Sequence, residues 1–161
     1  MSAAGGSGHT FVVEWREGFK VGIERVDAQH KHLFNLVKGL DLATIDKTMD
    51  ELLNYVVEHF STEQDLMEQY NYPEFRNHLN LHEEFAASVG DFLGTGDDWD
   101  EERLLTLRKF LNKWLIRHIM VHDLRFGRWY QQHKDSTPQA TSSEGQKSKR
   151  GLLARLLGRG D

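Results

Sequence analysis

The sequence predicts an all-α protein, an antiparallel up-down-up-down four-helix bundle with an extended N-terminal arm and a flexible C-terminal tail. Four stretches of roughly 15 to 25 residues carry apolar residues at three-and-four spacing. The segments between them are short, which favours antiparallel neighbours, and no alternating apolar pattern supports a sheet. At 161 residues, the chain is long enough for one domain with a sizeable core and too short for two.

The N-terminal segment predicts two different structures. Residues 1–9 are small and Gly-rich, which is typical of a disordered lead. The bundle itself is expected over residues 10–133. Within it, residues 11–23 contain Trp15 and Phe19 beside two glycines, a pattern too broken for a long helix. We expect an extended arm that packs its aromatic side chains against the bundle.

The first two helices are predicted from their apolar stripes. The first runs roughly from Val26 to Leu40. The second runs roughly from Asp46 to Tyr70, with Asp46 as the expected N-cap, because aspartate readily accepts hydrogen bonds from the first backbone N–H groups of a helix.

The last two helices begin at recognisable signals. The third is expected from Pro73 to about Phe92, since proline suits a first helical position. The fourth follows the loop Gly94–Asp98, with an aspartate as its cap, and fades near Tyr130. All four helices together make the bundle.

The C-terminal part differs in composition from the bundle. Residues 134–148 are a polar linker, and residues 149–161 read as a short basic tail with four leucines on one side. Five basic against two acidic side chains give residues 136–161 a charge of +3, so residues 1–135 carry −8 of the total of −5. The negative charge of residues 1–135 argues against nucleic-acid binding by the bundle.

Composition also bounds the chemistry and the compartment. Cysteine is absent, so disulfides, thiolate metal sites and haem-attachment motifs are excluded. No apolar run approaches the length of a membrane span, and the first residues lack a basic-then-apolar signal pattern. The expected compartment is the cytoplasm.

Histidines gather in four segments, one on each predicted helix. Residues four apart on a helix lie about 40° from each other around its axis, so such a pair can place two ligand atoms on one metal. Five imidazoles and two carboxylates exceed the needs of one ordinary metal site and suit two metals bridged by carboxylates. Imidazole with carboxylate favours iron or manganese. The four segments are Asp27–Lys31 with His30, His59-x-x-x-Glu63, His78-x-x-x-His82 and His118-x-x-x-x-Asp123.

Two points stay open at the level of spacing. His122 is four residues from His118, whereas Asp123 is five residues away and about 140° around an α-helix, so geometry alone does not choose between them. His32 is two residues from His30, so at most one of the two faces the site. A single histidine is more often a surface or core residue than a ligand, but four segments on successive helices favour metal binding. His9 and His133 are expected at the surface.

Over roughly residues 11–131 the chain resembles the hemerythrin family, in particular its single-domain bacterial members, the bacteriohemerythrins. All seven ligand types occur in order with the family spacing. Further carriers of the resemblance are Trp15, Val21-Gly22-Ile23, Asp27-x-Gln29-His30-Lys31 and Tyr72-Pro73.

The resemblance implies a non-haem di-iron site that binds O₂ reversibly, with two iron ions beside a bridging oxo or hydroxo group. One iron would take His78, His82 and His118, and the other His30 and His59 with an open position for O₂. Glu63 and Asp123 would bridge them, which makes Asp123 rather than His122 the ligand.

Three functions follow as hypotheses. The first is a binding protein for O₂ storage, delivery or scavenging, without enzymatic activity. The second is an enzyme that reduces peroxide or nitric oxide at the same site, and the third is an O₂ or redox sensor. Residues 147–159 would dock on a partner protein or an anionic membrane surface, and no nucleic-acid partner is expected.

Overall fold

The computed structural model describes residues 12–96 and 98–135, and within these ranges every regular element is helical. Two 3₁₀ turns, η2 (Glu17–Phe19) and η3 (Leu42–Thr44), accompany the helices. A π-helical segment, η4 (His118–Asp123), joins the last two helices without a break. The α-helices are α1 (Glu24–Lys38), α2 (Ile45–Gln69), α3 (Phe75–Leu93), α4 (Glu101–Arg117) and α5 (Leu124–His133).

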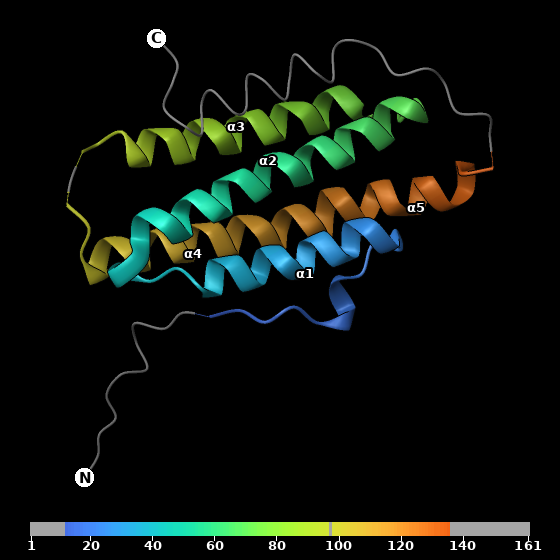
Figure 1. Cartoon of the computed structure of the whole chain (residues 1–161). Coiled ribbons are helices and arrows are strands. Elements are labelled where there is room, and N and C mark those ends of the chain that lie inside the picture. The colour runs from blue at the N-terminus through green and yellow to red at the C-terminus, as the bar shows by residue number, and fades with distance from the viewer. Residues whose placement is uncertain (1–11, 97, 136–161) are drawn as a thin grey trace.

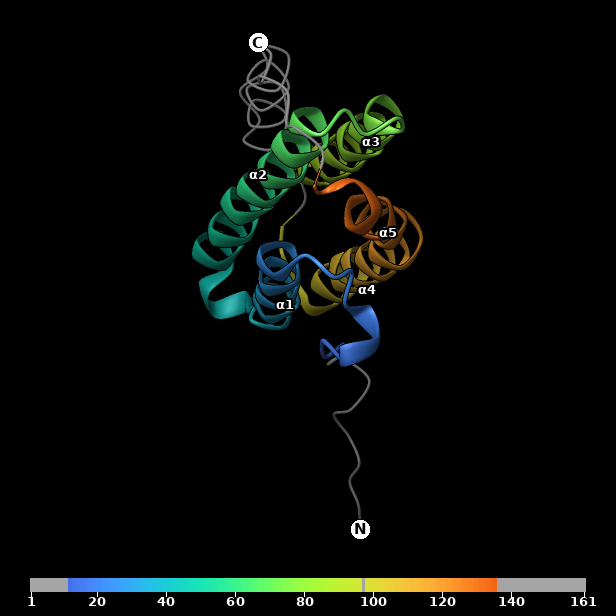
Figure 2. The same ribbon diagram turned by 90° about the vertical axis from the view of Figure 1, so that its right-hand side faces the viewer.

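These elements form the expected four-helix bundle. In Figure 1, α1, α2, α3 and the continuous rod α4–η4–α5 lie side by side, and successive rods run in opposite directions. Figure 2 looks nearly along them and shows one rod at each corner. Their apolar stripes meet at the centre, where the side chains are almost completely buried, among them Leu33, Phe34, Leu52, Phe60, Val89, Leu107 and Ile119.

The start of α2 differs from the prediction of an Asp46 cap. The helix begins at Ile45, so Asp46 lies within its first turn. Asp41 instead caps the preceding turn η3, where its side chain accepts a hydrogen bond from the backbone N–H of Ala43 at 3.4 Å. Asp46 nevertheless stabilises α2, because its negative charge lies in the first turn, at the positive end of the helix dipole.

The start of α3 also lies later than predicted. Pro73 belongs to a turn, and α3 begins at Phe75. The backbone N–H of Phe75 donates to the carbonyl of Tyr72 at 3.0 Å, so Pro73 occupies a turn position whose φ angle it also suits. The expected aspartate cap of the fourth helix is confirmed: the side chain of Asp100 accepts from the backbone N–H of Arg103 at 2.7 Å.

The N-terminal arm packs along the bundle as predicted. Phe19 is buried, and its ring stacks on Phe34 with centroids 5.4 Å apart. Asp27 in α1 accepts hydrogen bonds from the backbone N–H groups of Val21 and Gly22, at 2.8 and 3.2 Å. These contacts hold the arm against the first turn of α1, three residues before His30.

The arm also contacts α5, at the other end of the chain. Gly22 has a φ angle of +94°, which favours glycine, and its carbonyl accepts from the Gln131 side chain at 2.6 Å. A Cβ atom on Gly127 would lie 2.0 Å from the carbonyl oxygen of Val21. Only glycine at position 127 therefore allows this close approach.

Across the described parts of the chain, no helix is both long and apolar enough to cross a membrane. The expected disordered lead, most of the linker and the basic tail lie outside the described residues.

Candidate metal centre

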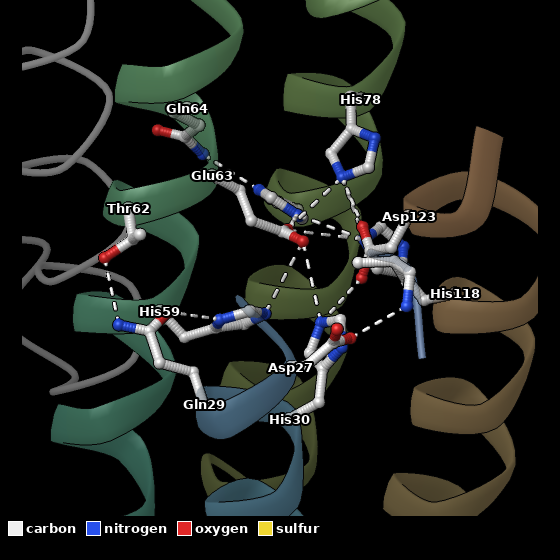
Figure 3. Close-up of polar contacts among 12 residues, drawn as sticks. Asp27, Gln29, His30, His59, Thr62, Glu63, Gln64, His78, His118 and Asp123 are labelled. Carbon is white, nitrogen blue, oxygen red and sulfur yellow. Dashed lines mark hydrogen bonds and ion pairs between the residues drawn. The ribbon is translucent and has the colours of Figure 1, made fainter. Parts of the chain in front are cut away.

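All seven side chains predicted to bind metal meet at one point inside the bundle. Each has at most 3 % of its surface exposed. In Figure 3 the labelled imidazoles of His30, His59, His78 and His118 point toward the carboxylates of Glu63 and Asp123. The contributing elements are α1 (His30), α2 (His59, Glu63), α3 (His78, His82) and η4 (His118, Asp123).

The two carboxylates divide the five histidines into two groups. Glu63 Oε1 lies 3.2 Å from His82 Nε2 and 3.4 Å from His78 Nε2, whereas Glu63 Oε2 lies 3.6 Å from His30 and 3.7 Å from His59. Asp123 repeats this arrangement. Its Oδ1 lies 3.0 Å from His78 and 3.2 Å from His118, and its Oδ2 lies 2.9 Å from His30. Each carboxylate thus presents one oxygen to each group, as a bridge between two metal ions requires.

The spacing of the nitrogen atoms fits an octahedral metal better than a tetrahedral one. The Nε2 atoms of His78 and His118 are 3.0 Å apart, and those of His82 and His118 are 3.1 Å apart. Ligands at about 2.1 Å from a metal are about 3.0 Å apart at 90° and about 3.4 Å apart at the tetrahedral angle. The two separations that involve His118 thus fit ligands at right angles on one metal ion better than ligands at the tetrahedral angle.

The cluster also has the donor atoms that a cation would satisfy. Four buried carboxylate oxygens, two each on Glu63 and Asp123, have no hydrogen-bond partner, and neither has His30 Nε2. These atoms lie close together but do not form properly directed hydrogen bonds with one another. Because unsatisfied buried polar atoms are costly, their convergence fits metal ions at their centre.

Burial and charge shift the pKa values of the histidines in opposite directions. Burial opposes the charged form of His30 and His78, but the attraction of the nearby Asp123 and Glu63 carboxylates outweighs it and raises the pKa of each to about 9. Burial lowers the pKa of His59 to about 4 and that of His82 to about 3. The charged form is therefore favoured for His30 and His78, beside the two carboxylates, and the neutral form for His59 and His82.

The carboxylates stay ionised in this environment. Burial alone would raise the pKa of Glu63 and of Asp123, but the surrounding imidazoles hold both pKa values well below their usual range. A metal cation that enters the cluster therefore meets two ready anionic ligands and displaces protons only from imidazole.

The π-helical segment decides between His122 and Asp123. In a π-helix the backbone hydrogen bonds join residues five apart, so Asp123 lies one turn above His118 and on the same side. Asp123 is 1 % exposed, whereas His122 is half-buried and lies outside the cluster. The spacing of an ideal α-helix could not predict that Asp123 faces the cluster, because no residue pattern in the sequence indicates a π-helical turn.

Two glutamines, Gln29 and Gln64, support the imidazoles. Residue spacing assigned neither of them a role. His59 Nδ1 donates to Gln29 Oε1 at 2.8 Å, Gln29 Nε2 donates to Thr62 Oγ1 at 3.1 Å, and Thr62 donates to the carbonyl of Glu58. This chain fixes the His59 ring with Nε2 toward the cluster. Both glutamines adjoin predicted ligands in sequence.

Gln64 has the same relation to the other histidine group. Its side-chain amide lies 2.9 Å from Nδ1 of His82. When the amide group of Gln64 is flipped, its oxygen accepts a hydrogen bond from the Nδ1–H group of His82. The Gln64 oxygen, which otherwise has no partner, is then satisfied.

The remaining histidines lie outside the cluster. His32 is exposed and packs against the ring of Tyr55 at 4.4 Å, so only His30 of that pair faces inward. His133 is partly buried rather than fully at the surface, because its ring stacks on Trp129 at 4.3 Å. His9 lies outside the described residues.

An apolar cavity of about 20 Å³ lies beside the cluster. Phe60 lines it and stacks on His82 with centroids 3.7 Å apart, and Trp114 lines it and stacks on His118 at 4.3 Å. This volume holds about one water-sized molecule, but a cavity with apolar walls stays dry. Its other walls are the aliphatic and aromatic side chains Leu33, Val37, Leu52, Val56, Phe85, Leu111 and Leu115.

Comparison with known proteins agrees with this geometry. Residues 21–130 match the family model described as the hemerythrin HHE cation binding domain. The chain belongs to the hemerythrin family. The matched range contains every side chain of the cluster, so the family's cation-binding description and the buried group of donors coincide.

Relatives in the family come from bacteria and from eukaryotes. The chain is 29 % identical over 119 residues to a bacteriohemerythrin of Stenotrophomonas maltophilia, with 68 % of this chain and 75 % of the relative covered. It is 34 % identical over 113 residues to a hemerythrin-like protein of Naegleria gruberi, covering 70 % and 88 %. A myohemerythrin of Theromyzon tessulatum is 28 % identical over 114 residues, covering 70 % and 89 %.

Proposed function

We propose that this chain holds two iron ions in the buried cluster and binds O₂ reversibly at one of them. The observation that carries the proposal is the division of the donors by Glu63 and Asp123, each of which turns one oxygen to each histidine group. Two adjacent ions bridged by carboxylates match this arrangement, and membership of the hemerythrin family supports iron as the metal.

The two ions would have unequal numbers of protein ligands. His78, His82 and His118 with one oxygen from each carboxylate give one ion five ligands. His30 and His59 with the remaining two oxygens give the other ion four. With an oxo or hydroxo group beside them, the ion held by fewer side chains would keep a position open, and we propose that O₂ binds there.

When bound, a pair of ferrous ions would supply the two electrons that O₂ binding requires. The protein's part is to hold the ligands and to keep water away. Phe60 and Trp114 cover the rings of His82 and His118, and the dry cavity between the four rods gives an apolar ligand a place to reside. Without water or an acidic side chain in that cavity, protonation of the bound ligand is slow, which favours release of intact O₂.

The metal content tests the proposal. Protein purified with iron should contain two irons per chain and should absorb in the near ultraviolet and visible through oxo-to-iron charge transfer. Glu63→Gln should lose at least one iron because it removes a bridge. Tightly held zinc in place of iron, or a reduced protein whose spectrum is the same with and without air, would contradict it.

A peroxide- or nitric-oxide-reducing enzyme is the competing function. Such an enzyme needs a proton donor beside the bound substrate, and the side chains that line the apolar cavity next to His82 and His118 are all aliphatic or aromatic. Rapid conversion of the oxygenated protein to the ferric form, with steady consumption of peroxide, would favour the enzyme over the binding protein.

A further inference from the structure

A polar pocket of about 370 Å³ lies in the groove between α3 and the η4–α5 part of the last rod. It is lined by two carboxylates, two amides, two imidazoles and one guanidinium, together with Tyr72 and Leu81. The side chains that matter are Glu74, Asn80 and Glu84 from α3 and its preceding turn, and His122 and Arg125 from the last rod, with His78 at the inner wall.

His78 connects this pocket to the cluster. One of its ring nitrogens faces Asp123 at 3.0 Å, and the other is directed away from the carboxylates in Figure 3. His78 is 3 % exposed, whereas His30, His82 and Glu63 have no exposed surface. Of the two groups of donors, the one containing His78 is therefore nearest to solvent on this side.

His78 also lies in the first turn of α3. Its backbone N–H donates to the carbonyl of Glu74 at 2.9 Å, at the first turn of the helix. Hydrogen bonds at helix ends break more readily than those in the middle. A small opening of this turn moves the His78 ring and gives the cluster a path to the pocket.

The apolar cavity cannot provide that path for a cation. A metal ion that entered it would lose its water ligands without gaining others, and the loss of hydration is expensive in an apolar environment. The polar pocket offers replacements, since carboxylate, amide and imidazole groups are the ligands that divalent iron accepts. Water in a pocket of this size completes the coordination.

We propose that this pocket is the route by which ferrous iron reaches and leaves the cluster, with Glu84 and His122 as transient ligands outside His78. The inference rests on the proposed function, because it assumes that the cluster holds iron. Glu84 and Glu74 attract the cation, and Arg125 repels it. Glu74 is less suited to a transient role, since its carboxylate already accepts from Asn77 at 2.6 Å.

The rate of iron uptake tests the route. Metal-free protein is mixed anaerobically with ferrous ions, and unbound iron is trapped at intervals with a colorimetric chelator. Removing a focusing charge from such a pocket should slow uptake by about tenfold, the low end of known electrostatic focusing effects. We expect slower uptake in the double variant Glu84→Gln with His122→Gln, and faster uptake in Arg125→Gln. The matched control is Glu51→Gln with His133→Gln, which lies outside the pocket and should not change the rate.

A second variant tests passage in the outward direction. Asn80→Trp fills the pocket without touching the cluster, so it should slow both uptake and chelator-driven loss of ferrous iron. All variants should reach the same final iron content. If two irons bind at unchanged rates in every pocket variant, the route is wrong while the di-iron proposal stands. If the unaltered protein binds no iron pair at all, the proposed function fails first.

Discussion

At the scale of single residues, the metal centre combines two kinds of side chain. The buried carboxylates of Glu63 and Asp123 need a cation, and the apolar rings of Phe60 and Trp114 pack against the imidazoles beside them. The structure brings together all seven side chains that the sequence predicted. Residues four apart share one side of α2 and of α3, and the π-helical turn does the same for His118 and Asp123. It also adds Gln29 and Gln64, whose roles depend on side-chain directions that spacing does not reveal.

The shifted pKa values of His30, His59, His78 and His82 predict a stability maximum near pH 6.5 for the metal-free protein, and the lowered pKa of His122 acts in the same direction as those of His59 and His82. Between pH 6.5 and about 9, folded protein keeps protons on His30 and His78 that unfolded protein has lost, so stability falls as pH rises. Below pH 6.5, unfolded protein protonates His59 and His82 and folded protein does not, so stability falls as pH falls. Denaturant midpoints across this range check it, and a midpoint that rises steadily up to pH 9 contradicts it.

The glutamine contacts predict selective loss of one metal ion. Gln29→Leu removes the acceptor of the His59 N–H and should weaken the ion held by His30 and His59 by about 10–100-fold. Gln64→Leu should instead weaken the ion held by His78, His82 and His118. Chelator competition measures both affinities. Equal loss of both ions in the two variants would show that the glutamines support the bundle and not particular ligands.

At the scale of elements, the π-helical segment is the feature that α-helical spacing could not predict. The sequence predicted one uninterrupted fourth helix. Spacing alone left His122 and Asp123 as alternatives, and only the family resemblance favoured Asp123. The wider turn accommodates one additional residue, places Asp123 in the cluster and leaves His122 in the polar pocket.

The π-helical segment predicts an unusual tolerance of deletion. Deleting the exposed Met120 shortens the spacing from His118 to Asp123 to four residues, which an α-helix also places on one side. The metal pair should therefore survive. Deleting the exposed Lys113 from α4 instead turns the following residues by about 100° and should abolish metal binding. Metal content and helical circular dichroism of both variants compare them, and equal damage would contradict the account.

The arm and α5 predict a second contrast, between two glycines. Gly127→Ala places a methyl group against the Val21 carbonyl and should destabilise the protein by about 1–3 kcal/mol, although alanine favours a helix. Gly18→Ala meets no atom within 4 Å and should change stability by less than about 0.5 kcal/mol. Unfolding in denaturant measures both. A stabilised Gly127→Ala variant would mean that the arm does not pack closely on α5.

At the scale of the whole molecule, the bundle was predictable because helices with one apolar stripe and short connections pack as antiparallel neighbours around one core. Helix starts were less predictable: Asp46 and Pro73 are good first-turn residues, yet neighbouring turns determine where each helix begins. The apolar cavity and the polar pocket beside the cluster suit different ligands. The dry one suits an apolar ligand, and the polar one suits a hydrated cation.

The central claim is that the cluster holds an iron pair with one open position for O₂. Its most direct test is repeated gas exchange on the reduced, iron-loaded protein, followed by its visible spectrum. We predict that a new absorption band appears with O₂, disappears when O₂ is removed, and returns over several cycles with two irons retained per chain. A band that never forms, or a single irreversible change to the ferric spectrum in the first cycle, would contradict the claim.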